Sequence, residues 1–220
     1  MHTLTDAQIE ALYLFTQKKG IQYYEVQIEL VDHLASSIEA EWAETPALPF
    51  DMALEDVYRR FGIFGFDELE AQKANALYKL QLKRWSRTFL KFLNVPLGLF
   101  TVLIFLGIRE TMQLVGFERF YWPYSLVLMA AGIGYMVFSS QKQKQKQQKK
   151  LMLLNFGRSF GVAFNLTWYI PFCILRHIQF TEFWVPALVY TALTVLLLSF
   201  IQTREAVQKQ AEALYPAAFA

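Results

Sequence analysis

Residues 184–201 read WVPALVYTALTVLLLSFI, a stretch of 18 residues without a charged side chain. At 1.5 Å per residue, a helix of this length covers about 27 Å, close to the roughly 30 Å thickness of a hydrocarbon core. The stretch is therefore predicted to be a membrane-spanning helix.

Three more stretches of the chain share this character, at residues 88–108, 120–140 and 155–175. Each alone could be a core helix of a soluble protein, but four of them within one part of the chain favour a membrane protein. The composition agrees, because 55% of the residues are hydrophobic and 18% are charged, against about 45–50% and about 25% in an average globular domain. The third stretch is the least regular, since Arg158 stands near its start.

The lysines and arginines predict the orientation of these spans. Residues 141–150, between the second and third spans, contain five lysines and no acid. Further cations lie just before the first span and just after the last, and the positive-inside rule places such segments in the cytoplasm. The N-terminal residues also lack a secretory signal. We therefore expect a membrane protein with both termini in the cytoplasm.

The first 80 residues are predicted to form a small helical domain. Thr5 and Gln8 have the spacing of a capping box, and Gly20 is suited to end the first helix. A stripe on the second helix is predicted to face the core. Asp51 is predicted to be the N-cap of a third helix, and a fourth helix is predicted to start near Asp67. The stripe comprises Tyr24, Ile28, Val31, Ala35, Ile38 and Trp42.

The predicted fold class is all-α, a small N-terminal helical cytoplasmic domain followed by a four-helix transmembrane bundle. The domains are 1–80, the cytoplasmic helical domain, then 81–205, the four-span domain, and 206–220, a cytoplasmic tail. Whether the fourth helix of the first domain continues into the first span is left open.

A polar face of the second helix is a candidate surface for a protein partner. Glu29 and His33 are four residues apart on it, a spacing that could also hold a divalent cation. No second His or Cys lies nearby, so a capping or packing role for His33 competes with metal binding, and no metal or other cofactor is predicted. The predicted partner surface comprises Glu25, Glu29, Asp32, His33 and Glu39.

The lysine-rich stretch 141–150 is a candidate site for anionic lipid headgroups, because cations near a membrane surface attract them. The alternative is that these lysines only fix the topology. Nucleic acid is not a predicted partner, because the net charge is only +2 and the stretch has no aromatic side chain for base stacking. The lysines are Lys142, Lys144, Lys146, Lys149 and Lys150.

Polar side chains inside the third predicted span have two interpretations. Asn165, Trp168 and Tyr169 could form hydrogen bonds between helices, or they could line a substrate path. Small residues four apart, such as Ala130 and Gly134, allow close helix contacts within the chain or between copies in a homo-oligomer.

The first domain resembles the HAAS-type domains and the related prefix domains of some bacterial permeases. The resemblance rests on Glu29-Leu30-Val31-Asp32-His33-Leu34, then Phe50 with Ala53-Leu54, and then Phe61-Gly62. The chain as a whole also looks like inner-membrane proteins of Bacteroidota. These resemblances imply a regulatory or protein-binding head without catalytic residues, on an anchor in the bacterial inner (cytoplasmic) membrane.

The function is predicted from the catalytic motifs that the sequence lacks as well as from the resemblance. No nucleophile elbow, P-loop, dinucleotide fingerprint or zinc-ligand set is found. We expect a non-enzymatic regulatory or accessory subunit that binds a protein partner or a second copy of itself. The alternatives are a transporter or channel subunit with a path along the third span, and a lipid enzyme at the membrane surface.

Overall fold

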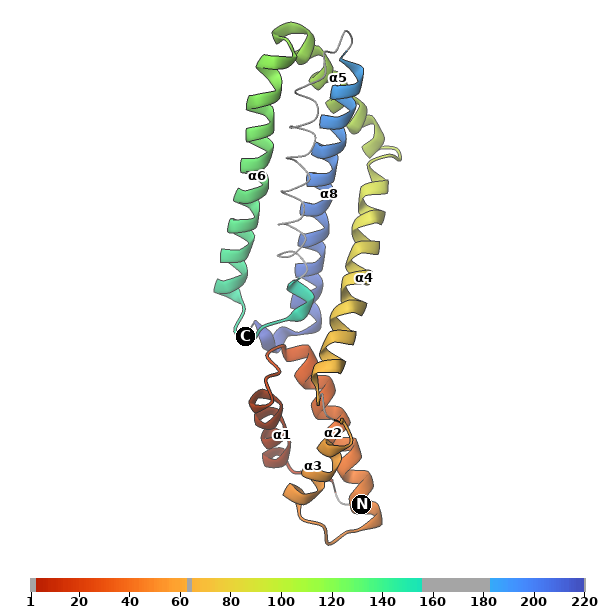
Figure 1. Ribbon diagram of the computed structural model, residues 1–220, viewed down its shortest axis with the longest axis vertical. Coiled ribbons are helices and arrows are strands. Elements are labelled where there is room, and N and C mark those ends of the chain that lie inside the picture. The colour runs from red at the N-terminus through yellow and green to blue at the C-terminus, as the bar shows by residue number, and fades with distance from the viewer. Residues whose placement is uncertain (1–2, 63–64, 156–182, 220) are drawn as a thin grey trace. The chain divides into compact units, whose positions relative to one another are not determined.

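The computed structural model describes residues 3–62, 65–155 and 183–219, and every regular element in these ranges is helical. The all-α class is therefore confirmed for this part of the chain. In chain order the elements are α1 (Asp6–Lys18), α2 (Tyr24–Glu44), α3 (Phe50–Arg59), α4 (Asp67–Lys91), α5 (Leu97–Val115), α6 (Phe117–Lys146), η1 (Met152–Leu154), α8 (Trp184–Leu214) and η2 (Pro216–Ala218) (Figure 1).

The chain divides into two compact units. The head unit comprises residues 1–78 together with two later segments, 147–152 and 215–220. The spanning unit comprises residues 79–146 and 153–214. The head unit thus contains the end of the lysine-rich stretch and the C-terminal residues in addition to the helices predicted for it.

The first helix of the head unit begins and ends as its sequence predicts. The Thr5 side chain accepts a hydrogen bond from the Gln8 backbone N–H, and the Gln8 side chain accepts one from the Thr5 N–H at 2.9 Å, which is a complete capping box. Gly20 follows the helix with φ of 95°, a left-handed conformation that suits glycine.

Helix α2 forms the centre of the head core, and its buried stripe is broader than predicted. Val31, Ile38 and Trp42 are buried as expected. Val26, Leu30 and Leu34 are also buried, whereas Tyr24, Ile28 and Ala35 are only partly buried. The reason is that α2 packs against both α1 and α3, so two neighbouring strips of its surface face the core.

The third helix starts earlier than predicted. Its N-cap is Pro49, with φ of −62° and ψ of 147°, and Asp51 lies in the first turn instead of capping the helix. The assignment of Asp51 as N-cap is therefore wrong. An acid in the first turn also interacts favourably with the helix dipole, so aspartate is favoured at this position as well as at the N-cap.

Three helices of the described residues are long and apolar enough to cross a membrane, namely α5, α6 and α8. The second and fourth predicted spans begin close to the starts of α6 and α8, but both helices continue further, to Lys146 and Leu214. The third predicted span, 155–175, lies outside the described residues apart from its first residue.

The first span differs from the predicted 88–108. Helix α4 ends at Lys91, a short irregular segment follows, and α5 begins at Leu97 with Pro96 as its N-cap. Proline has no N–H and disfavours helical geometry in the residue before it, so the helix is interrupted here. The fourth head helix and the first span are therefore two helices, and α5 extends beyond the predicted end at residue 108 to include Arg109.

The core of the spanning unit is formed largely by α6 and α8 and by the second half of α5. Two hydrogen bonds join α6 to α8, between Tyr124 Oη and Thr194 Oγ1 at 2.9 Å and between Ser125 Oγ and Tyr190 Oη at 3.0 Å. Of the aromatic residues at the start of α6, Tyr121 is buried in this core, whereas Trp122 is exposed.

Candidate functional site

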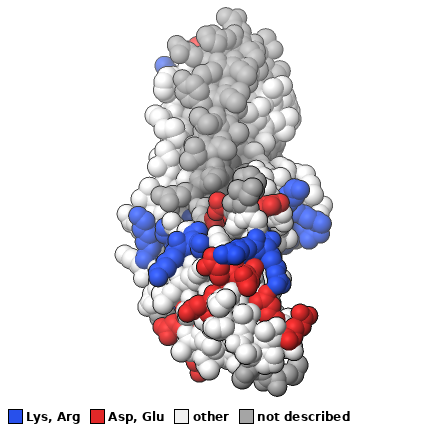
Figure 2. Space-filling view, turned by 60° about the horizontal axis from the view of Figure 1, so that its bottom comes forward, with Lys and Arg blue, Asp and Glu red and all other residues white. Residues whose placement is uncertain are grey.

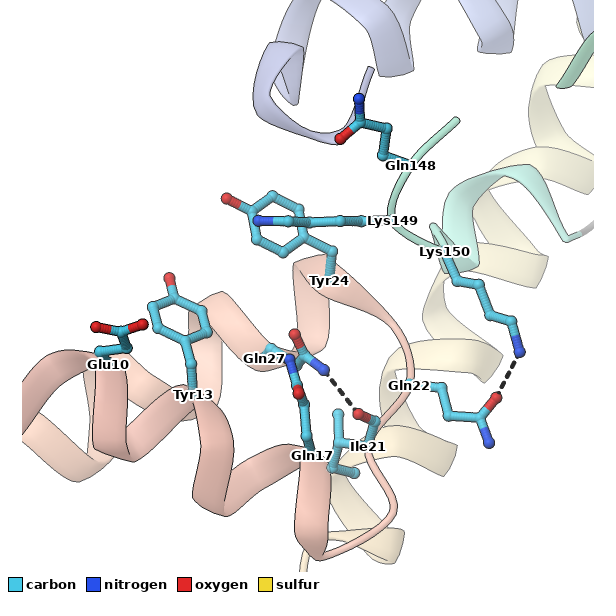
Figure 3. A pocket seen from close by; sticks show the side chains of 10 residues that line it. All are labelled: Glu10, Tyr13, Gln17, Ile21, Gln22, Tyr24, Gln27, Gln148, Lys149 and Lys150. Carbon is cyan, nitrogen blue, oxygen red and sulfur yellow. Dashed lines mark hydrogen bonds between the residues drawn. The ribbon is translucent and has the colours of Figure 1, made fainter. Parts of the chain in front are cut away.

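The head unit contains an open cleft of about 730 Å³, within the range of about 300–1,000 Å³ that is usual for ligand pockets. One wall comes from α1, a second from the α1–α2 turn and the start of α2, and a third from the segment that follows α6. The lining residues are Glu10, Tyr13, Gln17, Ile21, Gln22, Tyr24, Gln27, Gln148, Lys149 and Lys150 (Figure 3).

The wall from α1 follows directly from helical spacing. Glu10, Tyr13 and Gln17 are three and four residues apart, so they lie on one face of the helix. The opposite face carries Leu12 and Thr16 into the core, where both are 0% exposed. Burial of this core face therefore orients the polar face toward the cleft.

The turn between α1 and α2 is held by a buried amide. The Gln27 side chain is 6% exposed, and its Nε2 donates a hydrogen bond of 2.7 Å to the carbonyl oxygen of Ile21. The Ile21 N–H in turn donates to the Thr16 carbonyl oxygen at 3.2 Å. These two bonds fix the path of the chain along the floor of the cleft.

The third wall is distant in sequence but is bonded to the start of α2. The Tyr24 N–H donates to the Lys150 carbonyl oxygen at 2.8 Å, and Lys150 Nζ donates to Gln22 Oε1 at 2.7 Å. Lys149 Nζ lies 4.2 Å from the centre of the Tyr24 ring, a cation–π contact, and the Lys149 side chain crosses this ring in the view of Figure 3. The segment is thereby fixed against the head helices.

The C-terminal residues hold the same segment from another direction. The carbonyl oxygen of Ala218 accepts a hydrogen bond from the Gln148 N–H at 2.9 Å. Burial raises the pKa of Tyr215, and the negative charges of Glu25 and Glu29 raise it further. Tyr215 is therefore neutral at physiological pH, as its position near two carboxylates favours.

The cleft is suited to binding by hydrogen bonds and aromatic contacts. Burial raises the pKa of the Tyr13 phenol, with a smaller contribution from Tyr24, so the phenol is a neutral donor and acceptor. Glu10 supplies a negative charge and Lys149 a positive one. The lining offers amides, phenols and charged groups that can form hydrogen bonds and ionic contacts with a ligand.

The predicted partner surface on α2 is only partly free. Glu25 is buried, at 3% exposed, and Glu29 forms an ion pair with Lys73. Glu39 is half-buried and accepts a hydrogen bond of 3.1 Å from the Leu4 N–H. Asp32 and His33 remain exposed.

The hypothesis that Glu29 and His33 bind a metal ion is not supported by a third ligand in the described residues. No group of three or more His, Cys, Asp or Glu side chains that could hold a metal ion is present in residues 3–62, 65–155 and 183–219. A pair of ligands four residues apart, one of them already paired with a lysine, is not a metal site of usual composition.

The five lysines of the predicted lipid site have different surroundings. Lys142 and Lys144 are exposed on α6. Lys146 Nζ lies 3.8 Å from Glu212 Oε1, and Lys149 and Lys150 contact the head helices as described above. Figure 2 shows, on the face that it draws, several groups of Lys and Arg side chains beside Asp and Glu side chains.

The remaining predicted site residues, Asn165, Trp168 and Tyr169, lie outside the described residues. The cleft itself was not predicted from the sequence. Its α1 face has a readable spacing, but nothing in the sequence indicates that residues 148–150 meet Gln22 and Tyr24, more than 100 positions away.

Comparisons of the chain with protein-family models, with curated proteins and with solved structures gave no match. The fold itself defines the class, a helical protein with candidate membrane-spanning helices and a separate helical head unit. A function for this particular chain has to be argued from its own residues.

Proposed function

We propose that this chain is a non-enzymatic, multi-pass protein of the bacterial inner membrane that acts as a regulatory or accessory subunit, binding a protein partner through its cytoplasmic head. The proposal includes four spans, with residues 155–175 as the third, and a head related to HAAS-type domains. The lysine distribution of the sequence supports the orientation.

The observation that carries the proposal is the cleft in the head unit. Its amides and phenols match the hydrogen-bonding groups of a polar peptide segment, and its two tyrosines are of the type that anchors protein interfaces. Gln17 and Gln22 are exposed on its rim and have no competing role in the core.

The third wall of the cleft follows α6 in the sequence, and this connection suggests how partner binding in the head would affect the membrane part. Residues 148–150 follow α6 directly, because that helix ends at Lys146. A partner that fills the cleft would contact this segment as well as α1, so its binding energy depends on where the segment lies. Regulation through the head needs such a contact.

Photocrosslinking in cells tests the proposal with the full chain. A photoreactive amino acid at Gln17 should give a crosslinked partner protein, identified by mass spectrometry. The matched control position is Ala43, which is exposed on α2 and does not line the cleft. A Tyr13→Ala change should reduce the Gln17 crosslink about tenfold, as expected for an aromatic anchor. Equal crosslinks at Gln17 and Ala43, or none to any other protein, would contradict the proposal.

The orientation has a separate test. A reporter enzyme that is active only in the cytoplasm should be active when fused after Ala220 and inactive when fused into the α5–α6 turn at Gly116. Activity in the reverse pattern would overturn the topology without affecting the cleft.

A further inference from the structure

One face of α4 carries a cluster of cations close to the start of α5. Arg84, Arg87, Thr88 and Lys91 are separated by three, one and three residues, which places them on the same side of the helix. They line a groove of about 320 Å³ within the spanning unit. The opposite wall comes from α8 and consists of Thr203, Ala206, Val207 and Gln210.

The groove has a positive charge that its own lining does not neutralise. Three of the lining side chains are cationic and none is acidic. Arg84 donates a hydrogen bond to the side-chain oxygen of Gln210, a neutral group that orients the guanidinium without cancelling its charge. In the part of the chain that the structure describes, no ion pair includes Arg87 or Lys91.

The position of the groove along the helices corresponds to the polar boundary of a membrane. On α4, Lys91 is the last residue before Phe92 and Leu93, and Leu93 is 61% exposed. On α8, the uncharged stretch ends at Ile201 and Thr203 is the first groove residue after it. Both walls therefore place polar groups where apolar sequence ends, which is the depth of lipid headgroups.

The chemistry of the cations matches a phosphate group. Arginine presents a planar fork of donors that binds phosphate oxygens in pairs, and lysine adds a mobile point charge. Basic pockets between spanning helices are known binding sites for the headgroups of anionic lipids. We propose that this groove binds the phosphate of an anionic phospholipid. The proposal is independent of partner binding by the head.

The groove is a better lipid site than the lysine-rich stretch 141–150. Three of the five lysines there already contact Glu212, Tyr24 or Gln22 of the same chain. Lys142 and Lys144 stay exposed, but they are not part of the groove. They supply a control in which the same charge is removed elsewhere in the spanning unit.

The test is a lipid titration of the purified full chain in a neutral detergent, followed by native mass spectrometry. The probes are phosphatidylglycerol and phosphatidylcholine. The double variant R87Q/K91Q should raise the apparent Kd for phosphatidylglycerol at least about tenfold, given the contribution of each cation to anionic lipid binding. The control K142Q/K144Q should change it less than about twofold, and phosphatidylcholine binding should be equal in all three proteins.

Two further arms keep the result decisive. The charge-preserving variant R87K/K91R should bind phosphatidylglycerol within about threefold of the unchanged chain, because the charge remains and only the fork is lost at one position. If R87Q/K91Q does not elute as a folded species, the single change K91Q replaces it, and about fivefold weaker binding is expected.

The lipid must also be distinguished from a free anion. Millimolar inorganic phosphate should leave phosphatidylglycerol binding unchanged, because the acyl chains contribute to the affinity for the lipid alone. Full displacement by inorganic phosphate would overturn the assignment to a lipid. Equal loss in R87Q/K91Q and K142Q/K144Q, or no loss in either, would overturn the site.

Discussion

The two units of this chain place the same types of apolar residue differently, buried in the head unit and exposed on α5 of the spanning unit. In the head unit, Leu12, Leu34 and Ile38 are each 0% exposed. In α5, Leu99 is 62% and Leu103 is 66% exposed, and only 11% of the apolar window of that helix is buried. A continuous apolar surface of this kind is stable against lipid and not against water. The difference shows that leucines fill the core of the head unit, whereas those of α5 form an exposed apolar surface of the kind that a membrane-spanning helix presents.

The largest contrast is expected for leucine truncation. Leu34→Ala leaves a cavity in the head core and should lower the free energy of unfolding of the head by about 2–5 kcal/mol. Leu103→Ala removes a side chain from the exposed surface of α5 and should change stability by less than about 0.5 kcal/mol. Amide hydrogen exchange of α1–α3 peptides measures the first, and detergent unfolding followed by tryptophan fluorescence measures the second. Equal effects would mean that α5 is packed inside protein.

Loss of a buried hydrogen bond should also cost more stability in the head unit than in the spanning unit, but the difference should be smaller than for leucine truncation. Gln27→Leu leaves the Ile21 carbonyl oxygen without its partner and should cost about 1–3 kcal/mol in the head. Tyr190→Phe removes the bond to Ser125 in the spanning unit and should cost only about 0.6 kcal/mol, the average for bonds between membrane helices. The same two measurements apply. A larger cost for Tyr190→Phe than for Gln27→Leu would reverse the comparison.

The helix cap of the head should contribute less again. Thr5→Ala removes the acceptor of the capping box and should cost about 1 kcal/mol, whereas Thr5→Ser keeps it and should be nearly neutral. Hydrogen exchange at the first turn of α1 is the measurement. Equal exchange in the two variants would show that the cap does not limit opening of this helix.

The smallest effect is electrostatic and depends on pH. Burial raises the pKa of Glu70, and the charge of Asp67 raises it further. The pKa of Glu70 is higher in the folded than in the unfolded chain, so the fold favours the protonated carboxyl group. The stability that this group contributes is present at low pH and is lost as the pH rises through the folded pKa. Glu70→Gln should therefore raise the melting temperature slightly at pH 7 and leave it unchanged near pH 4. Glu68→Gln, at an exposed position of the same helix turn, is the control for removal of one acidic side chain. Equal changes in the two variants would contradict the role of burial at Glu70.

The sequence predicted those features that depend on neighbouring residues. The capping box at Thr5, the turn at Gly20 and the starts of α2, α4 and α8 are each read within a few positions. The start of α3 was misjudged because an acid in the first turn and an acid at the N-cap look alike in sequence. The shift of the first span arises from Pro96, whose effect on the preceding residues outweighs their hydrophobicity.

The candidate site was less predictable, because it depends on contacts between distant segments. The acidic face of α2 was read correctly as a helical face, but Lys73 and Leu4 bind two of its acids and Glu25 is buried. The cleft requires Lys150 to meet Gln22 and Tyr24. No periodicity within one helix encodes a pairing of that kind, so it could not be found before the chain was folded.

The place of Met152 has a consequence for the order of events during synthesis. Its side chain is part of the head core with Leu34 and Trp42, and the backbone of Lys150 accepts a hydrogen bond from Tyr24. A ribosome produces α1–α3 well before either residue, and α5 and α6 must emerge in between. The core of the head unit is therefore completed only after α5 and α6 have been synthesised.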